Sequence, residues 1–387
     1  MRRTEEYILK VCKEFFNIDN IIGIKEITGG HINETYEIEF KECRYVLQQL
    51  NGHVFYSPQG VMNNTRLIID HIRKKLIYNG HNPRNCLTLV KTKYDQDIAI
   101  IDDEYWRVTE YIENGISYDH IESPFHFYEC GRGVGKFQNM LSDFHTRLLD
   151  DSIRHFHDTP WRYERFKEAL KVNKFNRVSN CKKEIRQITS YSKDFDIITS
   201  KIINGDIPRR VTHNDTKSNN IMLDQNTGKF LTIIDLDTVM KGSLLYDYGD
   251  ALRFGASYAK EDETDLKKVG VNLKLVEAFT EGFLEELKPR DNVNCYKPIT
   301  PLEVLLFYQG FRIITIECAM RFLMDYIEGD HYFRIDKSRP EHNLERARNQ
   351  LKLAKEIEKN EIKIKRIINK LLIKLNYDNA YLIRLDE

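Results

Sequence analysis

Residues 211–224, which read VTHNDTKSNNIMLD, gather an acid, a base and two amides into one short segment between apolar ends. Polar groups of this kind cost free energy to bury unless they are paired. Asp215 can accept the proton of an attacking hydroxyl, and Asn220 can offer an amide oxygen to a magnesium ion. Asp235 follows fifteen residues beyond Asn220, at the end of TIID. Its carboxylate can join such an ion to phosphate oxygens.

The spacing His-x-Asp-x-x-x-x-Asn at residues 213–220 is that of the kinase catalytic loop. A lone His-x-Asp is usually a turn with local hydrogen bonds, but its conjunction with a later Asp-x-Asp favours a phosphoryl-transfer site. We therefore predict Asp215 as the catalytic base and Asn220 and Asp235 as Mg²⁺ ligands. Lys217 is expected to stabilise the transferring phosphoryl group, and His213 to brace the loop through backbone hydrogen bonds.

The elements around this loop change in character along the chain. Residues 21–111 alternate strand and turn signals around one helical stretch from Ser57 to Leu76, and helical spacings dominate after residue 112. The exception is a hairpin within 210–240, where NNIMLD and KFLTIIDLD flank QNTG. These patterns predict an α+β chain with a mainly antiparallel N-lobe at 1–112 and a mostly helical C-lobe at 113–387. The Lys- and Glu-rich tail, 344–376, is predicted to be a helix packed on the C-lobe rather than a membrane-surface or partner helix.

Composition narrows the class of protein. The 387 residues carry no net charge, which argues against nucleic acid as a partner. The seven cysteines are scattered without a Cys-x-x-Cys pair, which favours reduced thiols over disulfides or a zinc site. No stretch predicts a membrane span, and the N-terminus lacks the apolar core of a signal peptide. We expect a cytoplasmic protein, and the sequence leaves its oligomeric state open.

Three stretches, THNDTKSNNIMLD, IDLDTVMKGSLLYDYGDALRFGA and GGHINETYEI, resemble the aminoglycoside phosphotransferase and choline kinase-like superfamily. Within it, GGHIN, HNDTK, IDLDTVM and MRFLMDYIEGDHYF are most similar to the N-acetylhexosamine 1-kinases. The resemblance runs over roughly residues 20–335. It implies a two-lobed, protein-kinase-like fold with ATP and Mg²⁺ in the cleft.

The resemblance also implies a nucleotide site. Gly29 and Gly30 would form the turn over the phosphates, because glycine lets backbone N–H groups approach phosphate oxygens closely. Backbone groups from Glu110 to Ile112 would meet the adenine. One departure is that Gln48 stands where kinases carry a phosphate-binding Lys, and the helix from 57 to 76 contains no Glu to pair with such a Lys. Gln48 can still donate a hydrogen bond to phosphate, more weakly than a cation, so a catalytically silent nucleotide-binding protein stays an alternative.

No Ala-Pro-Glu follows Asp235, and the short connection suits a closed pocket for a small hydroxyl compound. Arg321 sits at i, i+4 spacing between two acids, which predicts either a salt-bridge ladder or, by the resemblance, a sugar contact shared with Tyr332. His31 and Asn33 would also face the sugar. The resulting prediction is an ATP- and Mg²⁺-dependent kinase acting on the anomeric hydroxyl of an N-acetylhexosamine. Another small alcohol, such as choline, homoserine or an aminoglycoside-like compound, is the alternative acceptor.

Overall fold

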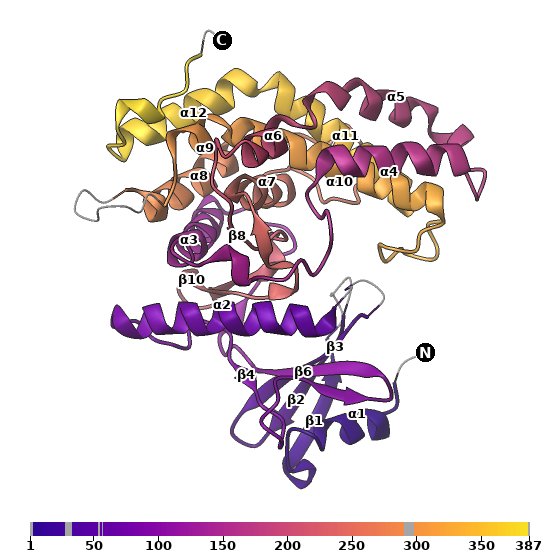
Figure 1. Ribbon diagram of the computed structural model, residues 1–387, viewed down its shortest axis with the longest axis vertical. Helices are drawn as coiled ribbons and strands as arrows, with labels where there is room; N and C mark the ends of the chain where they lie inside the picture. The colour runs from indigo at the N-terminus through magenta and orange to yellow at the C-terminus, as the bar shows by residue number, and fades with distance from the viewer. Residues whose placement is uncertain (1–2, 28–32, 53–54, 56, 290–297, 386–387) are drawn as a thin grey trace.

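The computed structural model describes residues 3–27, 33–52, 55, 57–289 and 298–385. A smaller N-terminal lobe is built on an antiparallel sheet, and a larger lobe is mostly helical (Figure 1). The predicted two-lobed α+β fold is therefore confirmed. The predicted boundary after residue 112 falls between the last long strand of the sheet and the first strand of the larger lobe, and it stays a prediction.

Six strands form the N-lobe sheet in the order β1-β2-β3-β6-β4, with β5 paired to β6, and all pairs are antiparallel. Their bounds are β1 Ile21–Glu26, β2 Glu34–Phe40, β3 Arg44–Leu50, β4 Leu89–Val90, β5 Ala99–Ile101 and β6 Glu104–Glu110. Helix α1, Glu5–Cys12, covers one face of this sheet by packing Ile8 and Val11 into the cluster around Trp106.

Helix α2, Pro58–Tyr78, lies between the sheet and the helical lobe (Figure 1). Ser57 caps it by accepting a hydrogen bond from the Gly60 N–H at 3.0 Å, and Pro58 occupies the first turn, where its missing N–H costs nothing. Its apolar stripe, which includes Ile68 and Ile72, packs into the core of the larger lobe. The predicted helix at 57–76 therefore forms, and it ties the two lobes together.

The larger lobe combines ten helices of the described chain with two small sheets, ordered β10-β9-β7 and β11-β8. The short strands are β7 Gly115–Ile116, β8 Arg210–Thr212, β9 Ile221–Asp224, β10 Phe230–Ile233 and β11 Met240–Gly242. The helices are α3 Pro124–Met140, α4 Thr159–Val172, α5 Lys182–Ser190, α6 Ile197–Ile203, α7 Leu244–Gly255, α8 Leu273–Leu287, α9 Pro301–Leu305, α10 Phe307–Glu328, α11 His342–Lys359 and α12 Glu361–Lys374.

Helices α7 and α10 approach closely where Gly249 meets Gly310. A Cβ at Gly249 would lie 2.3 Å from the Gly310 carbonyl oxygen, so only glycine fits there. This contact sets α10 beside the segment that follows the predicted magnesium ligands.

The C-terminal tail forms two helices, α11 and α12, which meet at Asn360, rather than the single helix the sequence predicts. Leu351, Ile357, Ile368 and Leu371 are buried in the cores of the larger lobe, so the packed alternative is the correct one. Among the described residues, no helix has both the length and the apolar character needed to cross a bilayer.

Candidate active site

The catalytic loop and the acidic turn emerge from the same end of a short hairpin. Strands β9 and β10 pair Ile221 with Ile233, and the Ile234 N–H donates to the Asn220 carbonyl at 2.9 Å. Asn220 and Asp235 therefore leave the hairpin next to each other. The predicted hairpin is confirmed, and it brings together two predicted magnesium ligands that lie fifteen positions apart in the chain.

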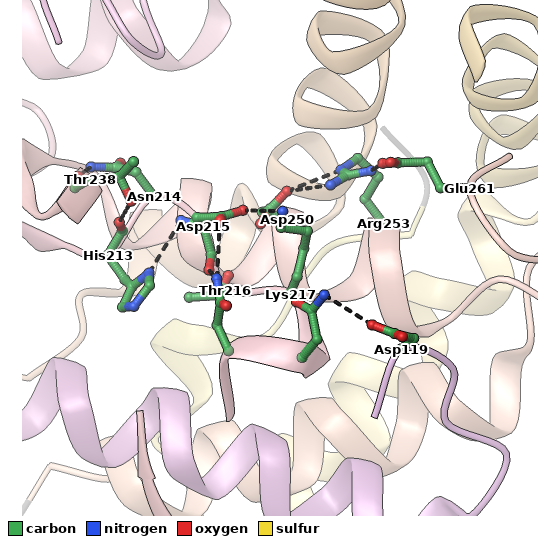
Figure 2. A network of polar contacts seen from close by, with 12 residues as sticks. Asp119, His213, Asn214, Asp215, Thr216, Lys217, Thr238, Asp250, Arg253 and Glu261 are labelled. Carbon is green, nitrogen blue, oxygen red and sulfur yellow. Dashed lines mark hydrogen bonds and ion pairs between the residues drawn. The ribbon is translucent and has the colours of Figure 1, made fainter. Parts of the chain in front are cut away.

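Buried polar contacts hold the loop in place (Figure 2). The His213 ring accepts the Asp215 N–H at Nδ1 (3.3 Å) and donates from Nε2 to the Ile234 carbonyl (2.9 Å), which confirms the bracing role predicted for it. Asp247, at the start of α7, accepts the backbone N–H groups of His213 and Asn214 at 2.9 and 2.7 Å. On the other side of Asp215, the Thr216 hydroxyl donates to the Asp247 carbonyl at 2.6 Å, so the backbone is fixed both before and after Asp215.

Asp215 is an ionised carboxylate within this frame. Its Oδ1 lies 3.0 Å from Lys217 Nζ, and its Oδ2 accepts a hydrogen bond from Asn220 Nδ2 at 3.0 Å. Burial opposes its ionisation, but the positive charge of Lys217 prevails and lowers the pKa of Asp215 below its ordinary 3.8. The pKa of Lys217 is raised in turn, because Asp215 and the nearby Glu261 outweigh its burial. The geometry thus provides a charged base beside a charged ammonium.

Asn220 and Asp235 fit a hard divalent cation. The Asn220 amide nitrogen is engaged with the main chain and side chain of Asp215, which turns its oxygen away from that residue. Burial and the negative charges of Asp237 and Asp215 raise the pKa of Asp235 to about 7. The charges of Asp237 and Asp215 repel an ionised Asp235, and a cation bound at Asp235 would relieve that repulsion.

Of the predicted nucleotide contacts, Gln48 lies on β3, Glu110 ends β6, and Ile112 follows that strand. Gln48 uses its amide within the sheet: Nε2 donates to Thr35 Oγ1 at 3.3 Å, and Oε1 accepts from Arg107. Glu110 donates its N–H to the Thr88 carbonyl, and Tyr111 donates to the Arg44 carbonyl.

In the stretch 110–112, the Ile112 N–H is therefore the backbone donor without a hydrogen bond in the described part of the chain. An adenine contact there stays a prediction. Gly29, Gly30 and His31 lie outside the described residues.

A cavity opens beside Asp215, between α7, α10 and the catalytic loop. The predicted sugar contacts Arg321 and Tyr332 both line this cavity, whereas Asn33 does not. The residues that line the cavity are Phe156, His157, Asn214, Asp215, Lys217, Thr238, Asp250, Arg253, Glu261, Ile314, Glu317, Cys318, Arg321, Phe322, Tyr332, Phe333 and Arg346. Asn33 instead donates to Asp237 Oδ2 at 2.6 Å. A sugar contact for Asn33 stays a prediction that this placement does not favour.

Arg321 does not form the salt-bridge ladder that helical spacing suggests. Glu317 pairs with His157 Nδ1 at 2.7 Å and accepts the Thr159 hydroxyl at 2.5 Å, while Asp325 caps the backbone of 331–333. Within the described chain, Arg321 makes no ion pair. Its Nη2 donates to Tyr332 Oη at 3.3 Å. The ladder alternative is therefore wrong, and the guanidinium is left at the wall of the cavity.

Aromatic rings around Arg321 and the acid Asp250 also line the cavity. The Arg321 guanidinium lies 4.7 Å from the ring centre of Phe156, 5.6 Å from Tyr332 and 5.4 Å from Phe333. Asp250 is only 6% exposed; its Oδ1 accepts two hydrogen bonds from Arg253, while its Oδ2 has no partner among the described residues (Figure 2). A buried carboxylate oxygen of this kind can accept a hydrogen bond from a bound acceptor molecule.

Sequence reasoning missed several residues that the structure brings to the site, namely Arg107, His157, Asn214, Asp237, Asp247 and Asp250. Asp237, Asp247 and Asp250 follow the predicted ligand Asp235 within one short stretch, and this density of acids was an available signal. The sequence gives no such signal for Arg107 and His157, because their partners are distant in the chain.

Comparison with known proteins agrees with this geometry. The model of the phosphotransferase enzyme family, APH, matches residues 23–270. The structure of a microcompartment-associated aminopropanol kinase superposes with a TM-score of 0.56 at 13% identity, covering 92% of this chain and 98% of that one.

A spectinomycin phosphotransferase in complex with ADP and spectinomycin gives a TM-score of 0.56 at 13% identity, over 92% of this chain and 99% of that one. Choline kinase from Cryptosporidium parvum Iowa II gives 0.54 at 16% identity, over 96% of this chain and all of that one (100%). At these identities the likeness establishes the fold.

Proposed function

This chain belongs to the phosphotransferase enzyme family, and from that premise we propose that it transfers the γ-phosphoryl group of ATP, with Mg²⁺, to the anomeric hydroxyl of an N-acetylhexosamine. The products are the sugar 1-phosphate and ADP. The spectinomycin phosphotransferase of the same fold was solved with ADP, which agrees with an adenine nucleotide as the donor.

Asp215 is the group that handles the acceptor proton. As the acceptor oxygen forms its bond to the γ-phosphorus, its proton passes to the Asp215 carboxylate, and the bond from phosphorus to the bridging oxygen breaks to release ADP. The low pKa of Asp215 keeps the carboxylate ionised, and Lys217 at 3.0 Å places a positive charge beside the transferring group. His213 and Asp247 hold this pair in position.

Asn220 and Asp235 are the residues that would hold Mg²⁺. Their oxygens are the ligand types this ion prefers, and they leave one hairpin end together. When bound, Mg²⁺ supplies neutralising charge at the phosphate oxygens.

The observation that carries the acceptor class is the charge pattern of the cavity. Arg321 stands at the cavity wall without an ion-pair partner in the described chain, and it already covers the faces of three aromatic rings. A quaternary ammonium such as choline binds through open aromatic faces and would meet a like charge here. Arg321 can donate hydrogen bonds to a bound molecule, and Asp250 Oδ2 can accept one from it. The cavity therefore suits a neutral phosphoryl acceptor that carries hydroxyl and carbonyl groups.

The choice of an N-acetylhexosamine among such acceptors rests on the similarity of GGHIN, HNDTK, IDLDTVM and MRFLMDYIEGDHYF to the N-acetylhexosamine 1-kinases. Arg321 and Tyr332 belong to the last of these stretches and line the cavity, which supports the assignment.

A small amino alcohol is the second candidate. Asp250 Oδ2 would accept a hydrogen bond from a primary ammonium as readily as from a hydroxyl, and Glu261 adds a second acid to the same wall. A primary amine is smaller than choline and needs no aromatic cage, so this candidate depends on the two acids Asp250 and Glu261.

A screen of ATP consumption separates these candidates. The acceptors are hexoses, N-acetylhexosamines, choline, 1-amino-2-propanol, homoserine and aminoglycosides, each tested with the unaltered protein and with Asp215→Asn as the control for contaminating kinases. We expect turnover with an N-acetylhexosamine that disappears in the variant. Turnover only with an amino alcohol would overturn the sugar assignment, and ATP binding without turnover of any acceptor would favour a silent nucleotide-binding protein.

A further inference from the structure

We propose that Arg107 of β6 supplies the phosphate-binding cation of the nucleotide site, in place of the Lys that kinases carry on the strand where this chain has Gln48. The inference deepens the proposed function and rests on it. It explains how a chain whose third strand carries only an amide at that position can still hold nucleotide phosphates.

The sheet register places Arg107 beside Gln48. The two residues lie directly opposite each other on antiparallel strands β6 and β3. Directly opposed residues project from the same face of a sheet. Arg107 Nε and Nη2 donate to Gln48 Oε1 at 3.1 and 2.9 Å, so the amide orients the guanidinium. A cation thus occupies the position expected for the kinase Lys, supplied from the neighbouring strand.

The partner of Arg107 comes from the other lobe. Its Nη1 pairs with Asp237 Oδ1 in the turn that begins at Asp235, and Asn33 donates to the other Asp237 oxygen at 2.6 Å. In kinases the counter-ion of the phosphate-binding Lys is a Glu on the lobe's helix. Here α2 presents Met62 to the guanidinium instead, with its sulfur 3.9 Å from Nη1. The counter-ion of Arg107 therefore lies in the turn that begins at Asp235, and not on α2.

Arg107 differs in its burial from the other basic residues of the described sheet. Of the Lys and Arg residues on the described strands β1 to β6, it alone is buried, with 3% exposure, whereas Lys25 is exposed and Arg44 is half-buried. A buried ion pair adds little to stability compared with apolar side chains of the same size, because both charges lose their hydration. A purely structural role gives no reason for a guanidinium at this point. Phosphate recognition does, because a guanidinium presents several N–H donors in a fork that matches phosphate oxygens.

The test compares ligands that differ only in phosphate. Calorimetry with adenosine, ADP and ATP in the presence of Mg²⁺ is run on the unaltered protein, on Arg107→Gln and on Arg107→Lys. We expect Arg107→Gln to raise the Kd for ADP and ATP about tenfold or more and to leave the Kd for adenosine unchanged. Arg107→Lys retains the charge and should recover most of the loss. Arg66→Gln removes an Arg of α2 that pairs with Asp97 on the surface, and it should change none of the three affinities.

Arg107→Gln leaves Asp237 buried without its cation and can fail to fold. The double variant Arg107→Gln/Asp237→Asn removes both charges and keeps the comparison available; it should show the same loss of affinity for ADP relative to adenosine. An unchanged difference between adenosine and ADP in a folded variant would overturn this inference alone. Failure of the unaltered protein to bind ADP or ATP would overturn the proposed function as well.

Discussion

Replacing Arg321 by Met tests the acceptor cavity most sharply, because the structure separates its effect on binding from its effect on stability. The guanidinium donates one side-chain hydrogen bond, of 3.3 Å to Tyr332, and makes no ion pair in the described chain. Its ring contacts with Phe156 and Phe333 are worth about 0.5–1 kcal/mol each. Its charge also helps to lower the pKa of Arg162, after the larger effect of burial, so removing it relieves a repulsion.

The stability cost of Arg321→Met should therefore stay below about 2 kcal/mol. A charge-assisted hydrogen bond to a sugar oxygen contributes about 1.5–3 kcal/mol, which corresponds to a fall in kcat/KM of about 10- to 150-fold. The KM for ATP should not change, since Arg321 lies in the cavity of α10 and away from β3 and β6.

The assay measures sugar kcat/KM, the KM for ATP and Tm on the same preparations. The control is Arg165→Met, which removes an Arg of α4 that pairs with Glu168 on the surface. A lowered Tm with unaltered sugar kinetics would refute the reasoning.

Three further variants test other parts of the site. Asp215→Asn should retain ATP affinity and lose about 10²–10⁴-fold in kcat, because the proton acceptor is gone; near-normal kcat would remove Asp215 from the mechanism. Asp235→Asn should abolish the Mg²⁺ dependence of nucleotide binding, and calorimetry with and without Mg²⁺ would expose an ion held elsewhere. Glu317→Gln tests stability against pH: burial raises the pKa of Glu317, but His157 outweighs it and holds that pKa below 4.5. The stabilisation by the Glu317 carboxylate is thus present above pH 4.5 and is lost as the pH falls through the pKa of Glu317 in the folded protein. The difference in unfolding free energy between the unaltered protein and the variant should therefore shrink in that pH range. A difference that stays constant with pH would contradict this prediction.

The catalytic loop was predictable because its information is local. Asp215, Lys217 and Asn220 lie within one short turn, and Asp235 is brought back by a hairpin whose strands and QNTG turn are visible in the sequence. The change of periodicity after residue 112 indicated a strand-rich part followed by a helical part, and the family resemblance implied their two-lobed arrangement. Hydrophobic period and turn chemistry are short-range signals, and they suffice for elements of this kind.

Contacts between distant segments were not predictable in the same way. Arg107 meets Gln48 across 59 positions and Asp237 across 130, and both depend on strand register and on how the lobes meet. The spacing of Glu317 and Arg321 favours a helical ion pair, but His157 and Thr159 reach Glu317 from 160 and 158 positions away and take its oxygens. A buried carboxylate takes the partners that satisfy it best, and tertiary packing chose them here. Asn360, which divides the predicted tail helix, gave no strong breaking signal.

The central claim is that the phosphoryl group is transferred to the anomeric oxygen of an N-acetylhexosamine, and the structure of the product tests it directly. The protein is incubated with ATP, Mg²⁺ and N-acetylglucosamine or N-acetylgalactosamine, and in parallel with the 1-O-methyl glycoside of the better substrate. Phosphorus–proton correlation in the NMR spectrum then assigns the phosphate. We predict a phosphate coupled to the anomeric proton and no reaction of the methyl glycoside. Phosphate on another oxygen, or ATP-dependent phosphorylation of the methyl glycoside, would contradict the account.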